Sequence, residues 1–420
     1  MDLNVAIISY HTCPLATLGG KDTGGMNVYI RDLSHALGRA GVHVDVYTRS
    51  QDEHVPHILH DLGYGNRVIH IPAGPESPLP KKTLSEFIPQ FSKEIINLTD
   101  KKDLKYDIIH SHYWMSGIAA KKLKKEWHIP IVHMFHTLSI MKNKVARDVS
   151  EIEGNYRLDG EHEIINFADQ IIAATKSEKD QLINLYHAEE KKISIIPPGV
   201  DISRFYPIPA EEAKDFIGIK PEDRMILFVG RIEPLKGIET LIRAISIIKD
   251  SEVMIDCPHH LVIIGGDPDT TNNGLNSEMA RVQKLSQDMG LQDLVIFLGK
   301  RDQDSLPYYY SAAEIVVVPS HYESFGMVAL EAMACGTPVI ASQVGGLAYL
   351  VQDGKTGFFV QDGDPDDLAK RLKQLICQDE LRYDFGKQAN IYAQKYSWDK
   401  ITKKMIKKYK NNIEKLNYSS

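Results

Sequence analysis

The sequence predicts an α/β protein with two doubly wound domains that face each other across a cleft. Short apolar, β-branched runs alternate with amphipathic stretches of helix length, which is typical of βαβ units. The runs are continuously apolar, as expected for strands of a parallel sheet that is buried on both faces. The series of runs stops before residue 200 and restarts after it, which indicates two domains rather than one.

The first series of predicted strands lies in an N-terminal domain, residues 1–200. These strands are expected at residues 5–9, 42–48, 68–71, 108–109, 131–135 and 171–174. The domain ends at Pro197, Pro198 and Gly199, which can continue neither a helix nor a strand and therefore form a linker. A length of 420 residues suits two or three domains of ordinary size.

The second series lies in a C-terminal domain, residues 201–395. Its strands are expected at residues 226–229, 261–264, 295–298, 315–319 and 339–341. In sheets of this kind ligands bind beyond the carboxyl ends of the strands, so the site is expected in the cleft between the domains.

Residues 396–420 are expected to form an amphipathic helix that packs back on the N-terminal domain. Apolar residues recur at near-helical spacing from Trp398 to Ile413, and residues 395–420 hold eight lysines against Asp399 and Glu414. The alternative is a basic helix that contacts an anionic membrane surface.

Composition excludes several classes of protein. Apolar residues make up 43% and charged residues 25%, which excludes disordered, collagenous and disulfide-stapled chains. The net charge of −7 argues against a nucleic-acid binder. The cysteines form no CxxC pair, and no signal peptide or apolar run of 18 residues is evident, so a cytoplasmic protein with reduced thiols is expected. These cysteines are Cys13, Cys257, Cys335 and Cys377.

In each domain, one glycine-containing loop follows the first strand. Residues 19–27 hold two glycine pairs before a helix expected near Val28, so backbone amides can approach an anion there. The spacing is not GxGxxG, which excludes a nicotinamide fingerprint. In residues 229–237, Arg231 and Lys236 could clamp a diphosphate. The alternative for residues 19–27 is an ordinary turn without a ligand, and the alternative for residues 229–237 is a solvated loop that carries scattered charge.

Glu323 and Glu331 are eight residues apart, around a helix expected to start near Phe325. Carboxylates can accept hydroxyls of a ribose or hexose, although paired carboxylates are also typical of hydrolysis. Histidines cluster at two strand ends: His110, His112, His133 and His136. Alternate histidines on a strand could bind zinc or serve as buried structural residues, and a functional role stays open for His136.

These motifs together resemble the family 4 retaining glycosyltransferases of the GT-B fold, over nearly the whole chain and in the right order. The residues that carry the resemblance are the glycine loop, Gly230-Arg231, Lys236-Gly237, Glu323 to Glu331 and Gly336-Thr337-Pro338-Val339. Within the family the chain most resembles the D-inositol-3-phosphate glycosyltransferases of mycothiol synthesis. It is also similar to sucrose-phosphate synthases, which typically have Gln after the glycine pair where this chain has Met26-Asn27.

The resemblance implies two Rossmann-like domains and a set of roles. On the donor side Gly24 and Gly25 lie at the diphosphate, Arg231 and Lys236 stabilise it as it leaves, and Arg301 lies by the nucleobase. Glu331 holds the ribose, Glu323 the transferred sugar, and His136 hydrogen-bonds that sugar near its anomeric carbon. The catalytic set is therefore His136, Arg231, Lys236 and Glu323. The acceptor side is implied to be His11, Asn27, Lys81, Tyr113, Thr137, Lys142 and Arg157.

The acceptor set also makes independent chemical sense. Three cations and two hydroxyls suit a phosphate monoester with a charge near −2. Lys82 adjoins Lys81, and either could fill that role.

The expected function is transfer of a hexose or N-acetylhexosamine, with retention, from a nucleotide diphosphate sugar such as a UDP-sugar to a hydroxyl of a phosphorylated acceptor such as inositol phosphate. The alternatives are sucrose-phosphate synthesis from UDP-glucose and fructose 6-phosphate, transfer to a lipid-linked acceptor, and a non-catalytic nucleotide-sugar-binding protein. No metal or cofactor is expected to be required, with stimulation by Mg²⁺ left open. No nucleic-acid partner is expected, and a homodimer is left open.

Overall fold

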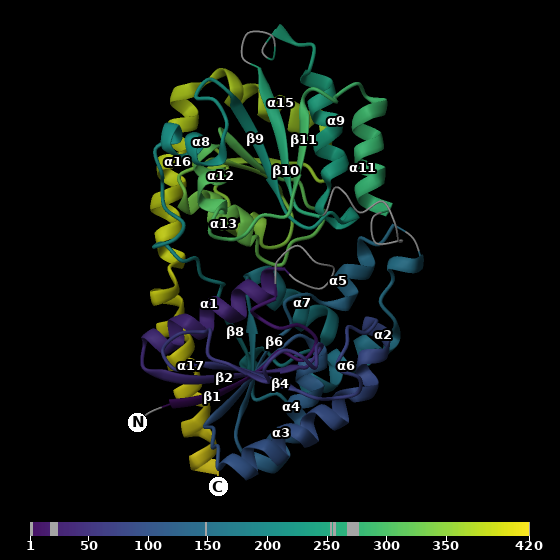
Figure 1. Cartoon of the computed structure of the whole chain (residues 1–420), viewed down its shortest axis with the longest axis vertical. Helices are drawn as coiled ribbons and strands as arrows, with labels where there is room; N and C mark the ends of the chain where they lie inside the picture. Colours follow the sequence, from purple (N-terminus) through teal and green to yellow (C-terminus); the bar gives the residue numbers. More distant parts are fainter. Residues whose placement is uncertain are drawn as a thin grey trace.

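Two parallel sheets, one in each half of the chain, organise the protein (Figure 1). The computed structural model describes residues 3–16, 24–147, 149–252, 254, 258–266 and 277–419. Cys257 and residues 19–23 of the glycine loop lie outside these ranges.

Among the residues that the structure describes, the N-terminal sheet has eight strands in the order β3-β4-β2-β1-β5-β6-β7-β8, and only β3 pairs antiparallel. Its strands are β1 (Leu3–Ile8), β2 (Val42–Arg49), β3 (Ile58–Leu59), β4 (Arg67–Ile71), β5 (Ile108–His112), β6 (Ile131–Met134), β7 (Gln170–Ala173) and β8 (Ile193–Ile195). Its helices are α1 (Gly25–Arg39), α2 (Lys81–Leu84), α3 (Ile88–Lys102), α4 (Trp114–Trp127), α5 (Ser139–Lys144), α6 (Asn155–Phe167) and α7 (Lys176–Tyr186).

The C-terminal sheet has six parallel strands in the order β11-β10-β9-β12-β13-β14. Its strands are β9 (Arg224–Val229), β10 (His259–Ile264), β11 (Val295–Gly299), β12 (Ile315–Val318), β13 (Val339–Ser342) and β14 (Gly357–Val360). Its helices are α8 (Ala210–Ile217), α9 (Ile238–Ile248), α11 (Ser277–Asp288), α12 (Leu306–Ala312), α13 (Met327–Ala334), α14 (Leu347–Leu350), α15 (Pro365–Cys377) and α16 (Asp379–Ala393).

The strand order places the functional loops. In the first sheet the order reverses between β1 and β5, and in the second between β9 and β12. Loops that leave neighbouring strands at such a reversal run in opposite directions and leave a crevice for ligands. The glycine loop follows β1 and the Arg231 loop follows β9, so both motifs lie at these two positions.

Several predicted boundaries were wrong by a few residues. The first helix begins at Gly25 instead of Val28, and the helix that carries Glu331 begins at Met327 instead of Phe325. β5 continues to His112 beyond the apolar pair that predicted it, because its polar side chains find buried partners. The short strands β3, β8 and β14 were not predicted.

The last helix, α17 (Trp398–Ser419), runs along the N-terminal domain and packs on α1 (Figure 1). Its apolar side chains Trp398, Ile401, Met405 and Tyr409 are buried in a cluster that extends through both domains. Within the described residues, none of the helices is long enough and apolar enough to cross a membrane.

The chain crosses between the domains twice, and the two crossings are hydrogen-bonded to each other. The Val200 amide donates to the Tyr396 carbonyl at 2.9 Å, and the Trp398 amide donates to the Val200 carbonyl at 3.2 Å. The linker and the start of α17 therefore form a paired connection, where a hinge would have to bend both segments together.

Removing the Met405 side chain should destabilise the protein, because this side chain is fully buried between the helix and the N-terminal domain. We expect Met405→Ala to lower the free energy of unfolding by about 2–5 kcal/mol, measured by urea denaturation. The neighbouring exposed Lys404 gives a matched control, since Lys404→Ala should change the free energy of unfolding by less than about 0.5 kcal/mol. Equal effects of both substitutions would contradict the packing of this helix.

Candidate functional site

A cavity of about 320 Å³ lies between the two domains, at the carboxyl ends of both sheets. Every predicted site residue except Lys142 and Arg157 lines it. The lining residues from the prediction are His11, Gly24, Gly25, Asn27, Lys81, Tyr113, His136, Thr137, Arg231, Lys236, Arg301, Glu323 and Glu331. One cavity therefore holds both the predicted donor side and the predicted acceptor side.

The start of α1 is fixed by Asn27. Its side-chain oxygen accepts from the Gly24 amide at 3.0 Å, and its side-chain nitrogen donates to Thr12 Oγ1 and to the Cys13 carbonyl, each at 2.7 Å. A Cβ on Gly24 would lie 3.4 Å from Arg231 Nε, so this turn approaches the other domain closely. The buried Asn27 side chain thus tethers the loop, in addition to lining the cavity.

Arg231 and Lys236 extend from the loop after β9, and each forms an ion pair with a carboxylate. Arg231 Nη1 lies 2.5 Å from Glu233 Oε1, and Lys236 Nζ lies 2.5 Å from Glu323 Oε2. Gly237 follows with a φ of +65°, and a Cβ there would meet the Pro319 carbonyl oxygen at 1.9 Å. Only glycine allows this loop to pack so closely against the end of β12 and place Lys236 beside Glu323.

The opposite end of the donor side is built by α12 and α13. Gly326 and Met327, at the N-terminus of α13, line the cavity together with Glu331 on the same helix. Burial raises the pKa of Glu331 to about 7, and its Oε2 accepts from the Tyr310 hydroxyl at 2.8 Å. Arg301 is held in place by its bonds to the Leu298 carbonyl at 2.7 Å and the Tyr309 hydroxyl at 2.9 Å.

The histidines at the ends of β5 and β6 are buried and neutral. His112 Nδ1 and His136 Nε2 share a hydrogen bond of 2.9 Å, and burial lowers the pKa of His136 to about 3. His136 has a φ of +63°, an uncommon conformation for a residue other than glycine, and lies between β6 and α5. Among the residues that the structure describes, no cluster of three metal-binding side chains exists, so the zinc interpretation finds no support.

Tyr113 forms the centre of the predicted acceptor side. Its ring centroid is 4.5 Å from that of His11, 5.3 Å from Lys81 Nζ and 4.9 Å from Arg157 Cζ. Its φ of +71° is also unusual, and its amide donates to the Met134 carbonyl at 2.9 Å. Two strained residues, Tyr113 and His136, thus lie at adjacent strand ends and face the cavity.

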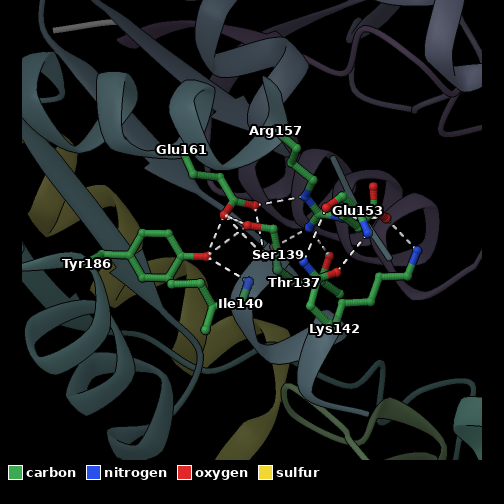
Figure 2. Close-up of polar contacts among 9 residues, drawn as sticks. Thr137, Ser139, Ile140, Lys142, Glu153, Arg157, Glu161 and Tyr186 are labelled. Carbon is green, nitrogen blue, oxygen red and sulfur yellow. Dashed lines mark hydrogen bonds and ion pairs between the residues drawn. The ribbon is translucent and has the colours of Figure 1, made fainter. Parts of the chain in front are cut away.

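Arg157 lies behind Thr137, in a buried polar network that Figure 2 shows. Its Nη2 donates to Thr137 Oγ1 at 3.0 Å, and its Nε donates to Glu161 Oε1 at 2.9 Å. Glu161 also accepts from the hydroxyls of Ser139 and Tyr186, at 2.6 and 2.5 Å. A buried arginine paired with a buried, hydrogen-bonded carboxylate is a rigid arrangement, so the position of Thr137 is well defined.

Three further observations refine the prediction. Lys81 lines the cavity whereas the neighbouring Lys82 is exposed, so Lys81 is the one positioned for a ligand. Sequence reasoning missed Glu153, whose carboxylate lies 2.9 Å from Arg157 Nη1 and 2.5 Å from Lys142 Nζ. It also missed the cavity-lining Gln303 and Tyr322. Glu153 belongs to no recognisable motif, and only its distance to the two cations identifies it.

Comparison with known families divides the chain at the same place as its two sheets. Residues 23–204 match the family "Glycosyltransferase Family 4", and residues 209–392 match "Glycosyl transferases group 1".

Individual proteins also match the chain over nearly its whole length. The chain is 37% identical to the D-inositol 3-phosphate glycosyltransferase of Actinosynnema mirum, over 96% of each chain. It is 38% identical to D-inositol 3-phosphate glycosyltransferase 2 of Catenulispora acidiphila, over 98% of this chain and 96% of that one. Sucrose-phosphate synthase from Thermosynechococcus elongatus superposes with a TM-score of 0.88 at 33% identity, over the whole of both chains. The chain therefore belongs to the glycosyltransferase family that includes these D-inositol 3-phosphate glycosyltransferases, and its fold is GT-B.

The buried histidines should make the protein less stable in acid. An unfolded histidine binds a proton below about pH 6.5, whereas burial lowers the native pKa of His110 to about 3. Stability from this residue is therefore full above pH 6.5 and is lost as the pH falls toward 3. Glu178 and Glu331, whose pKa values burial raises to about 7, act in the opposite direction.

Comparison of the wild type with a variant that lacks His110 separates the effect of this histidine from that of the opposing groups. Near pH 5, the free energy of unfolding of His110→Asn should depend on pH less steeply than that of the wild type, by about 1.4 kcal/mol per pH unit. Urea denaturation at pH 6, 5 and 4 measures the slopes, with the exposed His54→Asn as the matched control. Equal slopes for wild type and His110→Asn would show that His110 is protonated in the native protein.

Proposed function

We propose that this glycosyltransferase moves a hexose or N-acetylhexosamine, with retention of configuration, from a UDP-sugar to a hydroxyl of a phosphorylated acceptor such as inositol phosphate. One observation carries the proposal: assigned cations from both domains line the same cavity, together with His136. Arg231 and Lys236 are in the C-terminal domain, and Lys81 is in the N-terminal domain, where Lys81 and the buried Arg157 both lie by the Tyr113 ring. Such an arrangement suits one ligand with a diphosphate and a second with a phosphate.

On the donor side, the proposed roles follow the geometry. The Arg231 and Lys236 side chains bind the diphosphate together with the amides at the N-terminus of α13, where an anion is favoured. Arg301, fixed at the end of β11, lies at the nucleobase, and Glu331 accepts the ribose hydroxyls. Glu323 holds the hydroxyls of the transferred sugar.

Loss of the anionic diphosphate from the anomeric carbon is the difficult step. Arg231 and Lys236 stabilise the negative charge that develops on the leaving oxygens, so the proposed reaction requires no metal. The acceptor hydroxyl attacks from the face that the diphosphate leaves, and a diphosphate oxygen takes the hydroxyl proton. Neutral His136 hydrogen-bonds the sugar without adding a positive charge beside the developing oxocarbenium ion.

The acceptor phosphate is assigned to Lys81, Tyr113, Thr137, Lys142 and Arg157. The names of the relatives support inositol phosphate, since two of them are D-inositol 3-phosphate glycosyltransferases. The second candidate acceptor is fructose 6-phosphate, favoured by the similarity to sucrose-phosphate synthase over the full chain. Release of nucleoside diphosphate from UDP-, GDP- and ADP-sugars, each with inositol phosphate, fructose 6-phosphate and their unphosphorylated counterparts, distinguishes these acceptors. Turnover with unphosphorylated acceptors alone would refute the phosphate assignment.

Removal of either donor-side cation should abolish most of the activity. Arg231→Ala and Lys236→Ala are each expected to lower kcat about 100- to 1,000-fold, because each removes one interaction with the leaving group. Steady-state assays of nucleotide release measure the effect, and circular dichroism verifies the fold. Arg243→Ala is the matched control, because Arg243 is an exposed arginine that pairs with Glu239 on its own helix, α9. Near-normal turnover in both cleft variants would refute this mechanism.

The two adjacent lysines on α2 test the acceptor side. Lys81→Met should raise the acceptor KM about tenfold or more and leave the donor KM within about twofold, because a charge-assisted contact to the acceptor phosphate is lost. Lys82→Met removes the same charge from an exposed position and should change neither constant. Steady-state kinetics with each substrate varied in turn measures both. A parallel rise in the two KM values would argue against a phosphate at Lys81.

A further inference from the structure

Glu153 forms ion pairs with two of the cations that the proposed function assigns to the acceptor phosphate. Its carboxylate lies 2.9 Å from Arg157 Nη1 and 2.5 Å from Lys142 Nζ, and Figure 2 shows it between the two side chains. Arg157 and Lys142 are also the two predicted acceptor residues that do not line the cavity, although Thr137 and Tyr113, which Arg157 contacts, do.

The backbone at Glu153 is anchored separately from its side chain. The Glu153 amide donates to Asn143 Oδ1 at 2.7 Å, and the Asn143 side-chain nitrogen donates to the Glu153 carbonyl at 3.2 Å. These bonds connect the loop before α6 to α5. The carboxylate can therefore change rotamer while the loop remains in place.

Arg157 is held by other partners as well. Its Nε and Nη2 atoms bond to Glu161 and to Thr137, which leaves Nη1 as the group that faces Glu153. Departure of the Glu153 carboxylate would thus expose one edge of a guanidinium that stays fixed and charged. Such a preorganised donor suits a phosphate oxygen.

Charge balance favours an exchange of anions. The formal charges of Lys81, Lys142 and Arg157 against Glu153 and Glu161 sum to 3 − 2 = +1. A phosphate dianion added to this cluster would leave −1, whereas replacement of the Glu153 carboxylate by the dianion leaves three cations against Glu161 and the dianion, 3 − 3 = 0. Burial alone would raise the pKa of Glu153, but Arg157, Lys142 and Lys81 hold it below its ordinary value, so the carboxylate is a charged competitor.

We propose that Glu153 is an internal counter-ion of the acceptor site, which occupies Arg157 and Lys142 until the phosphate of the acceptor displaces it. This inference rests on the proposed function, because it assigns the same cations to that phosphate. Glu153 lowers the affinity of every anion for these cations by the same factor. An acceptor compensates through the contacts of its other hydroxyls, whereas inorganic phosphate has no such contacts and binds the wild type weakly. Glu153 therefore sets the intrinsic affinity that an anion needs in order to occupy the site, and it leaves the ratio of affinities among anions unchanged.

Binding of inorganic phosphate tests the proposal directly. Isothermal titration calorimetry with saturating UDP, which blocks the diphosphate subsite, should show phosphate binding to Glu153→Gln about tenfold more tightly than to the wild type, equivalent to about 1.4 kcal/mol. Glu153→Ala, a second variant that cannot hydrogen-bond either cation, should show at least the same gain. Phosphate should also inhibit transfer by both variants more strongly, in competition with the acceptor.

Glu151→Gln is the matched control, because Glu151 lies in the same segment and accepts from the Arg147 amide instead of pairing with Arg157 or Lys142. It removes one negative charge nearby and should leave phosphate affinity unchanged; an equal gain in this control would overturn the proposal by indicating a general charge effect. Equal phosphate affinity in wild type and both Glu153 variants would overturn the counter-ion role while leaving the proposed function intact. No phosphate binding by the wild type or by either Glu153 variant, each shown to be folded by thermal unfolding, would overturn both.

Discussion

The arrangement of the cleft depends on one constraint: positive charges held in a partly buried site must have negative partners when no ligand is bound. Arg231 pairs with Glu233, Lys236 with Glu323, and Arg157 with Glu161 and Glu153. An isolated charge in such a place would cost several kcal/mol, so these carboxylates are what allow the cations to be stored there. Substrate phosphates would then replace existing partners instead of entering an empty positive field.

Two sheets bring these charges together, and two connections hold the sheets in relation to each other. The linker at Val200 and the entry to α17 at Trp398 are hydrogen-bonded to each other, and α17 then packs on the N-terminal domain. Tyr409 of this helix bonds to His110, two residues before His112, which contacts His136 in the cavity. The helix with the most lysines thus uses its apolar face to support the wall of the site.

Sequence patterns predicted those parts of the structure that follow from local chemistry. Continuous apolar runs located most strands, and glycines beside charged residues located the loops at the two strand reversals. β5 was predicted too short because His110, Ser111 and His112 look polar in sequence, and their partners come from distant segments. The choice between Lys81 and Lys82 also needed the structure, since adjacent residues on a helix point about 100° apart. Glu153 had no local signal, because its meaning lies only in its distance to two cations.

The donor side shows what the exchange of partners could accomplish. Lys236 and Glu323 bind each other, so a ligand that uses either side chain has to replace this ion pair. In the proposed reaction the diphosphate draws Lys236 away, and this releases the Glu323 carboxylate to accept hydroxyls of the sugar attached to that same diphosphate. On this proposal a nucleotide diphosphate that carries a sugar would satisfy both side chains, whereas one without a sugar would leave Glu323 unpaired. A single ion pair would therefore couple recognition of the leaving group to recognition of the group that is transferred.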